Sequence, residues 1–144
     1  MSKKIYISIF ISVLCGVVLL WAVFKCYEES KRALTIGTVS ALYSAIICEI
    51  DKSSLPVLSV FYGNNTTEPQ TLNSKKYDRL INILLQKNYN LDAPKYWDRS
   101  KPLCDVWGNR FIILYESNEA EKIKITVLSK GTDGLINTKD DIKQ

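Results

Sequence analysis

Residues 5–24 decide the architecture, and they read IYISIFISVLCGVVLLWAVF, an uninterrupted run of uncharged and mostly apolar side chains. At 1.5 Å rise per residue, a helix of this length covers the ~30 Å hydrocarbon core of a bilayer. Basic residues precede the run, and Lys25 follows it. We therefore predict that residues 1–24 form a basic flank and a transmembrane helix, and that residues 25–144 form a separate domain.

The orientation of this span is nearly balanced by charge, because Lys3 and Lys4 on one side face Lys25, Lys31 and Arg32 on the other. We favour a cytoplasmic N-terminus and an exported C-terminal domain, which makes this a single-pass protein of the inner (cytoplasmic) membrane. A cleaved signal peptide is the alternative. The apolar run is longer than the usual ~7–15 residues, and no small-x-small cleavage site follows it, so a retained anchor is favoured.

The helix is expected to continue beyond the membrane. Residues 25–52 contain no proline, and Gly37 is the one weak point, since glycine costs ~1 kcal/mol relative to alanine in a helix. Apolar residues recur at a spacing of three and four, which places them on one face. They are Val39, Leu42, Tyr43, Ile46, Ile47 and Ile50. This pattern predicts one helix from Ile5 to about Lys52, and a break near Lys31 or Gly37 is the alternative.

Pro56 is expected to stop this helix, and residues 57–62 are expected to form an edge strand or a segment that simply packs. Asn73 or Ser74 then caps a second helix that runs to about Asn88. Its apolar residues also recur at helical spacing and are expected to face the core. They are Tyr77, Leu80, Ile81, Leu84 and Leu85.

The rest of the domain is predicted to be an irregular segment and a β-hairpin. Residues 89–109 carry Tyr96, Trp97 and Trp107, and aromatic side chains in such a segment usually fix a loop on a core. Residues 111–115 and 123–128 are rich in β-branched and aromatic side chains and are joined by the polar residues 116–121. Ile123, Ile125 and Val127 alternate with Lys124, Thr126 and Leu128, so one face is apolar and the other mostly wet. The predicted fold class is α+β.

Composition excludes several functions. The chain of 144 residues has no histidine, which removes Ser-His and Cys-His nucleophile pairs and the commonest transition-metal ligand. Its formal net charge of +4 is modest, and lysine and arginine are scattered rather than clustered. We expect neither an enzyme nor a nucleic-acid-binding protein, and we predict no small-molecule substrate.

The C-terminal stretch has the composition of a hard-cation site. Ser129-Lys130-Gly131-Thr132-Asp133-Gly134 is followed by Asp140-Asp141-Ile142, so three carboxylates lie within nine residues. Hard cations bind oxygen ligands gathered by a turning backbone, and a divalent ion would convert the mutual repulsion of these carboxylates into a clamp. The alternative is a solvated acidic tail in which Asp133-Gly134 forms an ordinary turn.

Two local motifs, together with the order of the elements, resemble the major pseudopilin family of type II secretion systems. That family typically shows Asp-Pro-Trp-Gly-Asn-Pro before its first sheet strand, and residues 105–110 here read Asp-Val-Trp-Gly-Asn-Arg. It also shows Ser-x-Gly-x-Asp-Gly and then Asp-Asp-Ile near the C-terminus, as residues 129–134 and 140–142 do here. The resemblance covers the chain from about Ala33 onward.

The resemblance implies a pilin-like fold, in which the long helix packs on a second helix and a small antiparallel sheet. It implies a structural Ca²⁺ bound by the C-terminal loop, whose spacing does not fit an EF-hand. The implied ligands are Ser129, Asp133, Asp140 and Asp141, with backbone carbonyls near Leu128 and Lys130. Asp105, Trp107 and Gly108 would form a structural loop. The implied partners are the membrane and other pseudopilin-like subunits or secretion-machine components.

The membrane end departs from that family. Pseudopilins carry a leader that ends in glycine and is cut before phenylalanine, with a glutamate shortly beyond, whereas here Gly16 precedes Val17 and Leu20 stands where the glutamate would be. Residues 5–24 contain no acidic residue. A stand-alone membrane-anchored binding or sensing module that does not polymerise is therefore the alternative function.

Four cysteines are present, and none has metal-ligand spacing. Cys48 and Cys104 would lie in the exported domain, where an oxidising compartment permits a disulfide. A pair that closes such a long loop would stabilise the fold by a few kcal/mol. Two buried free thiols are the alternative.

Overall fold

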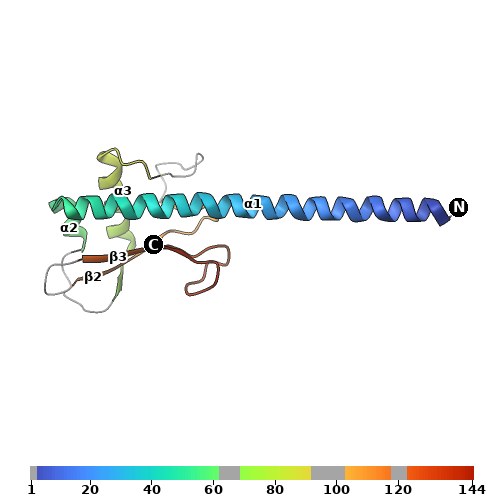
Figure 1. Ribbon diagram of the computed structural model, residues 1–144. Helices are drawn as coiled ribbons and strands as arrows, with labels where there is room; N and C mark the ends of the chain where they lie inside the picture. The colour runs from blue at the N-terminus through green and yellow to red at the C-terminus, as the bar shows by residue number, and fades with distance from the viewer. Residues whose placement is uncertain (1–2, 62–68, 92–102, 118–122) are drawn as a thin grey trace. The chain divides into compact units, whose positions relative to one another are not determined.

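A computed structural model describes residues 3–61, 69–91, 103–117 and 123–144, and Tyr96 and Trp97 therefore lie outside the described residues. The chain divides into two compact units, Met1–Ala33 and Leu34–Gln144. The elements in chain order (Figure 1) are α1 (Lys3–Asp51), α2 (Leu55–Phe61), β1 (Gln70–Thr71), α3 (Ser74–Gln86), β2 (Ile112–Ser117), β3 (Ile123–Ser129) and β4 (Ile142–Lys143). The predicted α+β class is confirmed.

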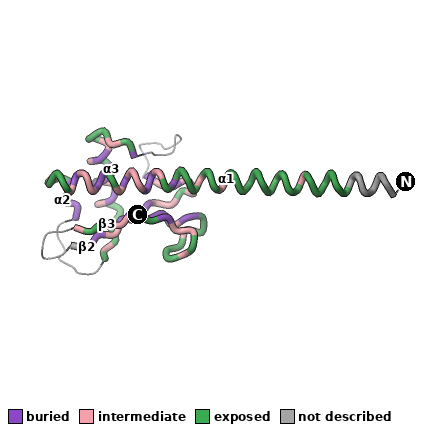
Figure 2. Tube along the Cα trace, viewed as in Figure 1, coloured by how far each residue is buried: buried purple, intermediate pink, exposed green. Residues whose placement is uncertain are grey.

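The first helix, α1, is unbroken over its 49 residues. One continuous helix was the expectation and is confirmed, whereas the alternative of a break near Lys31 or Gly37 is wrong. In the first unit the large apolar side chains from Phe10 onward are exposed, as the green tube in Figure 2 shows. By length and composition this stretch can cross a membrane. The division between the two compact units, at residues 33 and 34, does not mark a membrane edge, so the end of the span at residue 24 stays a prediction.

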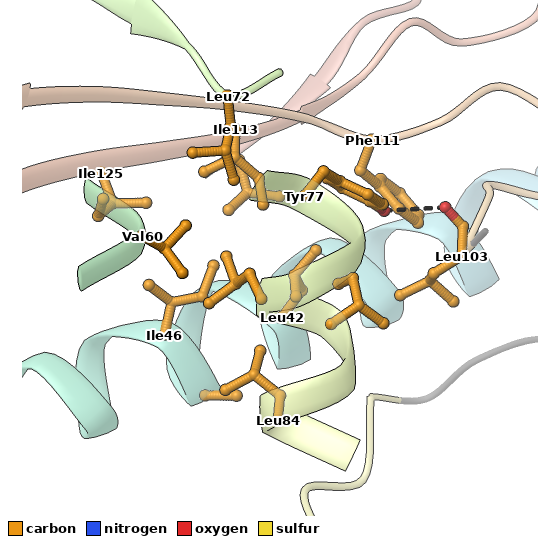
Figure 3. Packing of buried hydrophobic residues seen from close by; sticks show 14 of the residues in the cluster. Leu42, Ile46, Val60, Leu72, Tyr77, Leu84, Leu103, Phe111, Ile113 and Ile125 are labelled. Atoms are coloured by element: carbon orange, nitrogen blue, oxygen red, sulfur yellow. Dashed lines mark hydrogen bonds between the residues drawn. The ribbon is translucent and has the colours of Figure 1, made fainter. Parts of the chain in front are cut away.

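The second unit is built on the last turns of α1. Val39, Leu42 and Ile46 are buried there, as predicted, together with Ala45. Burial at three- and four-residue spacing places these side chains on one face of the helix. Figure 3 shows Leu42 and Ile46 beside α3 side chains in the core. Each fully buried aliphatic side chain of this kind contributes roughly 1.5–3 kcal/mol.

The segment after Pro56 is a helix, and the expectation of an edge strand is wrong. Val57, Val60 and Phe61 are buried, so the alternative that the segment simply packs holds for the described part of 57–62. Pro56 is the second residue of α2, where a missing N–H breaks no helical hydrogen bond. The carbonyl of Ser54 accepts from the N–H groups of Val57 and Leu58 and so begins the new helix.

The third helix, α3, matches the prediction closely. Asn73 is the N-cap, because its Oδ1 accepts from the N–H of Lys76 at 3.0 Å. The helix ends at Gln86, two residues before the predicted Asn88, which has a left-handed φ of 60°. Four of the predicted apolar residues are buried: Tyr77, Leu80, Ile81 and Leu84.

The sheet has four antiparallel strands in the order β1-β2-β3-β4. The predicted hairpin is confirmed, with Ile112 opposite Leu128 and Ser117 opposite Ile123, although residues 118–122 of its turn lie outside the described residues. Ile125 and Val127 are buried as expected. Leu128 is buried as well, so the opposite face of β3 is less exposed to solvent than predicted. The short strands β1 and β4 had no sequence signal strong enough to predict them.

Candidate cation site in the C-terminal loop

The site begins with Asp105, a buried carboxylate at the start of the turn that precedes β2. Its Oδ1 accepts from the backbone N–H groups of Trp107 at 3.0 Å and Asn109 at 2.8 Å. Its Oδ2 accepts from the Ser129 hydroxyl at 2.6 Å. Gly108 has φ +88°, a conformation that a side chain disfavours. One carboxylate thus holds its own turn and the end of β3 together.

Ser129 and Asn109 join this turn to the C-terminal loop. The Ser129 hydroxyl is buried, donates to Asp105 and accepts from the N–H of Gly131 at 3.2 Å. The side-chain amide of Asn109 donates to the carbonyl of Gly131 at 2.8 Å. The two sequence motifs, residues 105–110 and 129–134, therefore meet in space. Ser129 lies at the base of the loop, where its hydroxyl bonds Asp105 rather than a carboxylate of the acidic loop.

Asp140 folds back onto the turn that follows β3. Its Oδ2 accepts from the N–H of Thr132 at 2.6 Å, from the Thr132 hydroxyl at 2.7 Å and from the N–H of Asp133 at 3.2 Å. The bonds from Thr132, and then those from Thr138 and Asp133, lower the pKa of Asp140. The fit requires Gly131, because a Cβ there would lie 2.4 Å from Asp140 Oδ2.

Three carboxylates converge on the hydroxyl of Thr138. Its Oγ1 lies 2.7 Å from Oδ1 of Asp140 and 3.4 Å from Oδ1 of both Asp133 and Asp141. A hydroxyl has one proton, so it can donate fully to only one of these three oxygens. The predicted acidic residues are thus brought together, around a threonine that sequence reasoning missed. A lone threonine in a polar loop offers no pattern that would have revealed it.

The donor chemistry of this cluster suits Ca²⁺. The ion takes six to eight oxygens at about 2.3–2.6 Å, from carboxylates, carbonyls and water. As placed, the acidic side chains do not form a closed coordination shell, and within the described ranges no group of three or more Asp, Glu, Cys or His side chains is arranged to hold a metal ion. Lys130 lies at the start of the loop, whereas Leu128 lies within β3, opposite Lys143. Calcium therefore stays a prediction, with Asp133, Asp140 and Asp141 as its carboxylates.

A second polar cluster, which the sequence did not reveal, lies where α1 ends. The Glu49 side chain is 2% exposed and pairs with Lys87. It also accepts from the Tyr89 hydroxyl at 2.8 Å, and Lys52 Nζ lies 3.7 Å away. The hydrogen bond from Lys87, helped by Tyr89 and opposed by desolvation, lowers the pKa of Glu49 from 4.5 to about 2. Lys87 also donates to Ser54 at 3.0 Å, so the cluster ties α1 to the end of α3.

Cys48 and Cys104 are both free thiols in this structure, so the possible disulfide between them is not formed here, and each thiol is half-buried rather than fully buried. Hydrogen bonds with Tyr89 and Lys52 lower the pKa of Cys48. Burial, and then the charge of Asp105, raises the pKa of Cys104. The two thiols thus have different surroundings, one beside the Glu49 cluster and one beside the Asp105 turn.

Comparisons with protein-family models, with curated proteins and with solved structures find no match for this chain. The resemblance to the major pseudopilins therefore stays a prediction that rests on residues 105–110, 129–134 and 140–142. Any functional assignment must come from the residues and contacts of the chain itself.

Proposed function

We propose that this chain is a pseudopilin-like structural subunit of a type II secretion or pilus-type envelope machine. In this proposal α1 anchors it in the inner membrane, the unit Leu34–Gln144 is exported, and Ca²⁺ fixes the C-terminal loop. Its partners are other pseudopilin-like subunits or components of the secretion machine, and its role is assembly rather than catalysis.

The observation that carries the proposal is the meeting of the two motifs. Asp105 accepts from Ser129, and Asn109 donates to Gly131, so the loop before β2 and the loop after β3 share one hydrogen-bond network. These are the segments on which the family resemblance rests. A solvated tail would not be held at its base by buried hydrogen bonds, because ordering a loop costs conformational entropy.

The proposed role of calcium follows from the charge of the loop. Asp133, Asp140 and Asp141 bring three negative charges around Thr138, and only hydrogen bonds oppose their repulsion in the described part of the loop. A bound Ca²⁺ would compensate these charges and hold β4 against β3. Ser129 and Asp105 would position the loop without touching the ion.

Thermal unfolding of the full chain in mild detergent tests the calcium part. If calcium binds only the folded chain, an excess of one hundred times the dissociation constant stabilises it by about 2.7 kcal/mol. We expect calcium to raise the midpoint of the wild type and of the control Asp51→Asn, whose carboxylate is exposed at the end of α1. We expect no rise for Asp133→Asn combined with Asp141→Asn. An unmoved wild-type midpoint would remove calcium from the proposal.

The stand-alone module is kept as a second candidate because the apolar run itself lacks the family features. Leu20 stands where a pseudopilin has its glutamate, and Gly16 precedes valine rather than phenylalanine. Intact-mass measurement of the chain recovered from membranes separates the cases. Processing with N-methylation favours the subunit, an unprocessed start favours the module, and loss of the whole apolar run identifies a signal peptide and refutes the anchor.

A further inference from the structure

Asn109 joins the turn before β2 to the C-terminal loop, and its backbone is fixed within that turn. The Asn109 N–H donates to Asp105 Oδ1 at 2.8 Å, and the Asn109 carbonyl accepts from the Asp105 N–H at 2.8 Å. The other oxygen of this carboxylate, Oδ2, accepts from the buried Ser129 hydroxyl. The side chain of Asn109 therefore extends from a backbone that is held at both of its polar groups.

This side chain contacts two glycines of the C-terminal loop. Its Nδ2 donates to the carbonyl of Gly131 at 2.8 Å, and Gly131 is buried. Its Oδ1 faces Gly134, where an added Cβ would lie 3.4 Å away. Both glycines have left-handed φ angles, +64° and +69°, which residues with a side chain rarely adopt. One amide thus contacts both glycines on which the backbone conformation of the loop depends.

The carboxylates of the loop are placed by the backbone that Asn109 contacts. The two residues after the first glycine, Thr132 and Asp133, donate their N–H groups to Asp140 Oδ2 at 2.6 and 3.2 Å. The residue after the second glycine donates its N–H to Asp133 Oδ1 at 2.8 Å. The backbone just beyond each glycine therefore orients two of the three carboxylates that are expected to bind calcium.

We propose that Asn109 is a positioning residue for the cation site: its amide holds both glycine turns, so that Asp133 and Asp140 are arranged before the ion binds. The proposal rests on the calcium site of the proposed function, and it assigns Asn109 no contact with the ion. Preorganisation of a site raises affinity because less conformational freedom is lost on binding. A loop without this amide should therefore bind the same ion more weakly.

Calorimetric titration of the full chain with calcium chloride in mild detergent tests this role. Asn109→Ala removes the amide, and Asn82→Ala is the matched control, because Asn82 is exposed on α3. We expect Asn109→Ala to raise the dissociation constant about 3- to 10-fold, the effect of one net hydrogen bond, and the control to leave it unchanged. Equal affinity of Asn109→Ala and the wild type would refute the positioning role while leaving the calcium site intact. A wild type that binds no calcium would refute the calcium site itself, and the positioning role with it.

Hydrogen exchange without calcium, followed by NMR, gives a readout that a general loss of stability would not produce. We expect Asn109→Ala to speed exchange of the Thr132 and Asp133 amides about 3- to 10-fold, with no change at the buried Leu84 of α3. Asn109→Asp should have the same effect, because an ionised carboxylate has no proton to donate to the Gly131 carbonyl. Wild-type exchange in Asn109→Asp, or equal acceleration at Leu84, would overturn the proposal.

Discussion

Replacing Asp105 should destabilise the fold more than replacing any surface carboxylate. Asp105→Ala leaves three donors without their acceptor: the N–H groups of Trp107 and Asn109, and the Ser129 hydroxyl. An unsatisfied buried donor costs about 1–3 kcal/mol. Ser129 is fully buried and Trp107 and Asn109 are half-buried, so water relieves part of the cost of the latter two. We expect Asp105→Ala to lower the free energy of unfolding by about 3–5 kcal/mol.

Denaturant unfolding of the full chain in mild detergent, followed by tryptophan fluorescence, measures this loss. Asp78→Ala is the matched control, because Asp78 is 46% exposed and its 3.5 Å ion pair with Arg110 is expected to contribute about 0–1 kcal/mol. A double-mutant cycle of Asp105→Ala with Ser129→Ala should give a coupling of about 0.5–3 kcal/mol. The reasoning fails if Asp105→Ala costs no more than Asp78→Ala, or if the coupling is zero.

Two further predictions concern the acid limit of stability and the backbone of the loop. The folded pKa of Glu49 is about 2, below its ordinary 4.5, so its stabilisation is present above pH 4.5 and is lost as the pH falls toward 2. Glu49→Gln should flatten this part of the stability profile measured by unfolding at each pH. Glu116→Gln should not, because the Glu116 side chain is only half-buried and pairs with the exposed Lys124. Gly131→Ala should lower the thermal midpoint, since φ is +64° and the new Cβ would meet Asp140; an unchanged midpoint would mean that the loop is not held as described.

Periodicity in the sequence predicted the parts of the fold that bury one face. The spacing of apolar residues predicts the apolar stripe on the second half of α1, the extent of α3 and the hairpin. It does so because burial of one face in the core requires apolar side chains at the period of the helix or strand. The helix α2 was not predicted, because proline disrupts a helix interior but is tolerated in the first turn of a new helix, and the sequence around Pro56 does not separate the two cases.

The site was less predictable, because side-chain contacts depend on residues far apart in the chain. The acidic residues were identified from the sequence. Spacing alone could not predict that the Ser129 hydroxyl donates to Asp105, or that the Thr138 hydroxyl lies within hydrogen-bond distance of Asp140. Glu49 was missed for the same reason. Its partners Lys87 and Tyr89 come 38 and 40 residues later, and a single carboxylate beside an apolar stripe gives no sign of burial.

Direct titration of the full chain with calcium tests the central claim most directly. Calorimetry should show one Ca²⁺ bound per chain, with a dissociation constant on the order of the 0.1–1 mM of extracellular calcium modules. Binding should disappear when Asp133→Asn and Asp141→Asn are combined, and it should persist in Asp51→Asn. Absence of binding at millimolar calcium, or equal binding by all three proteins, would contradict the proposal that the acidic loop is a calcium clamp.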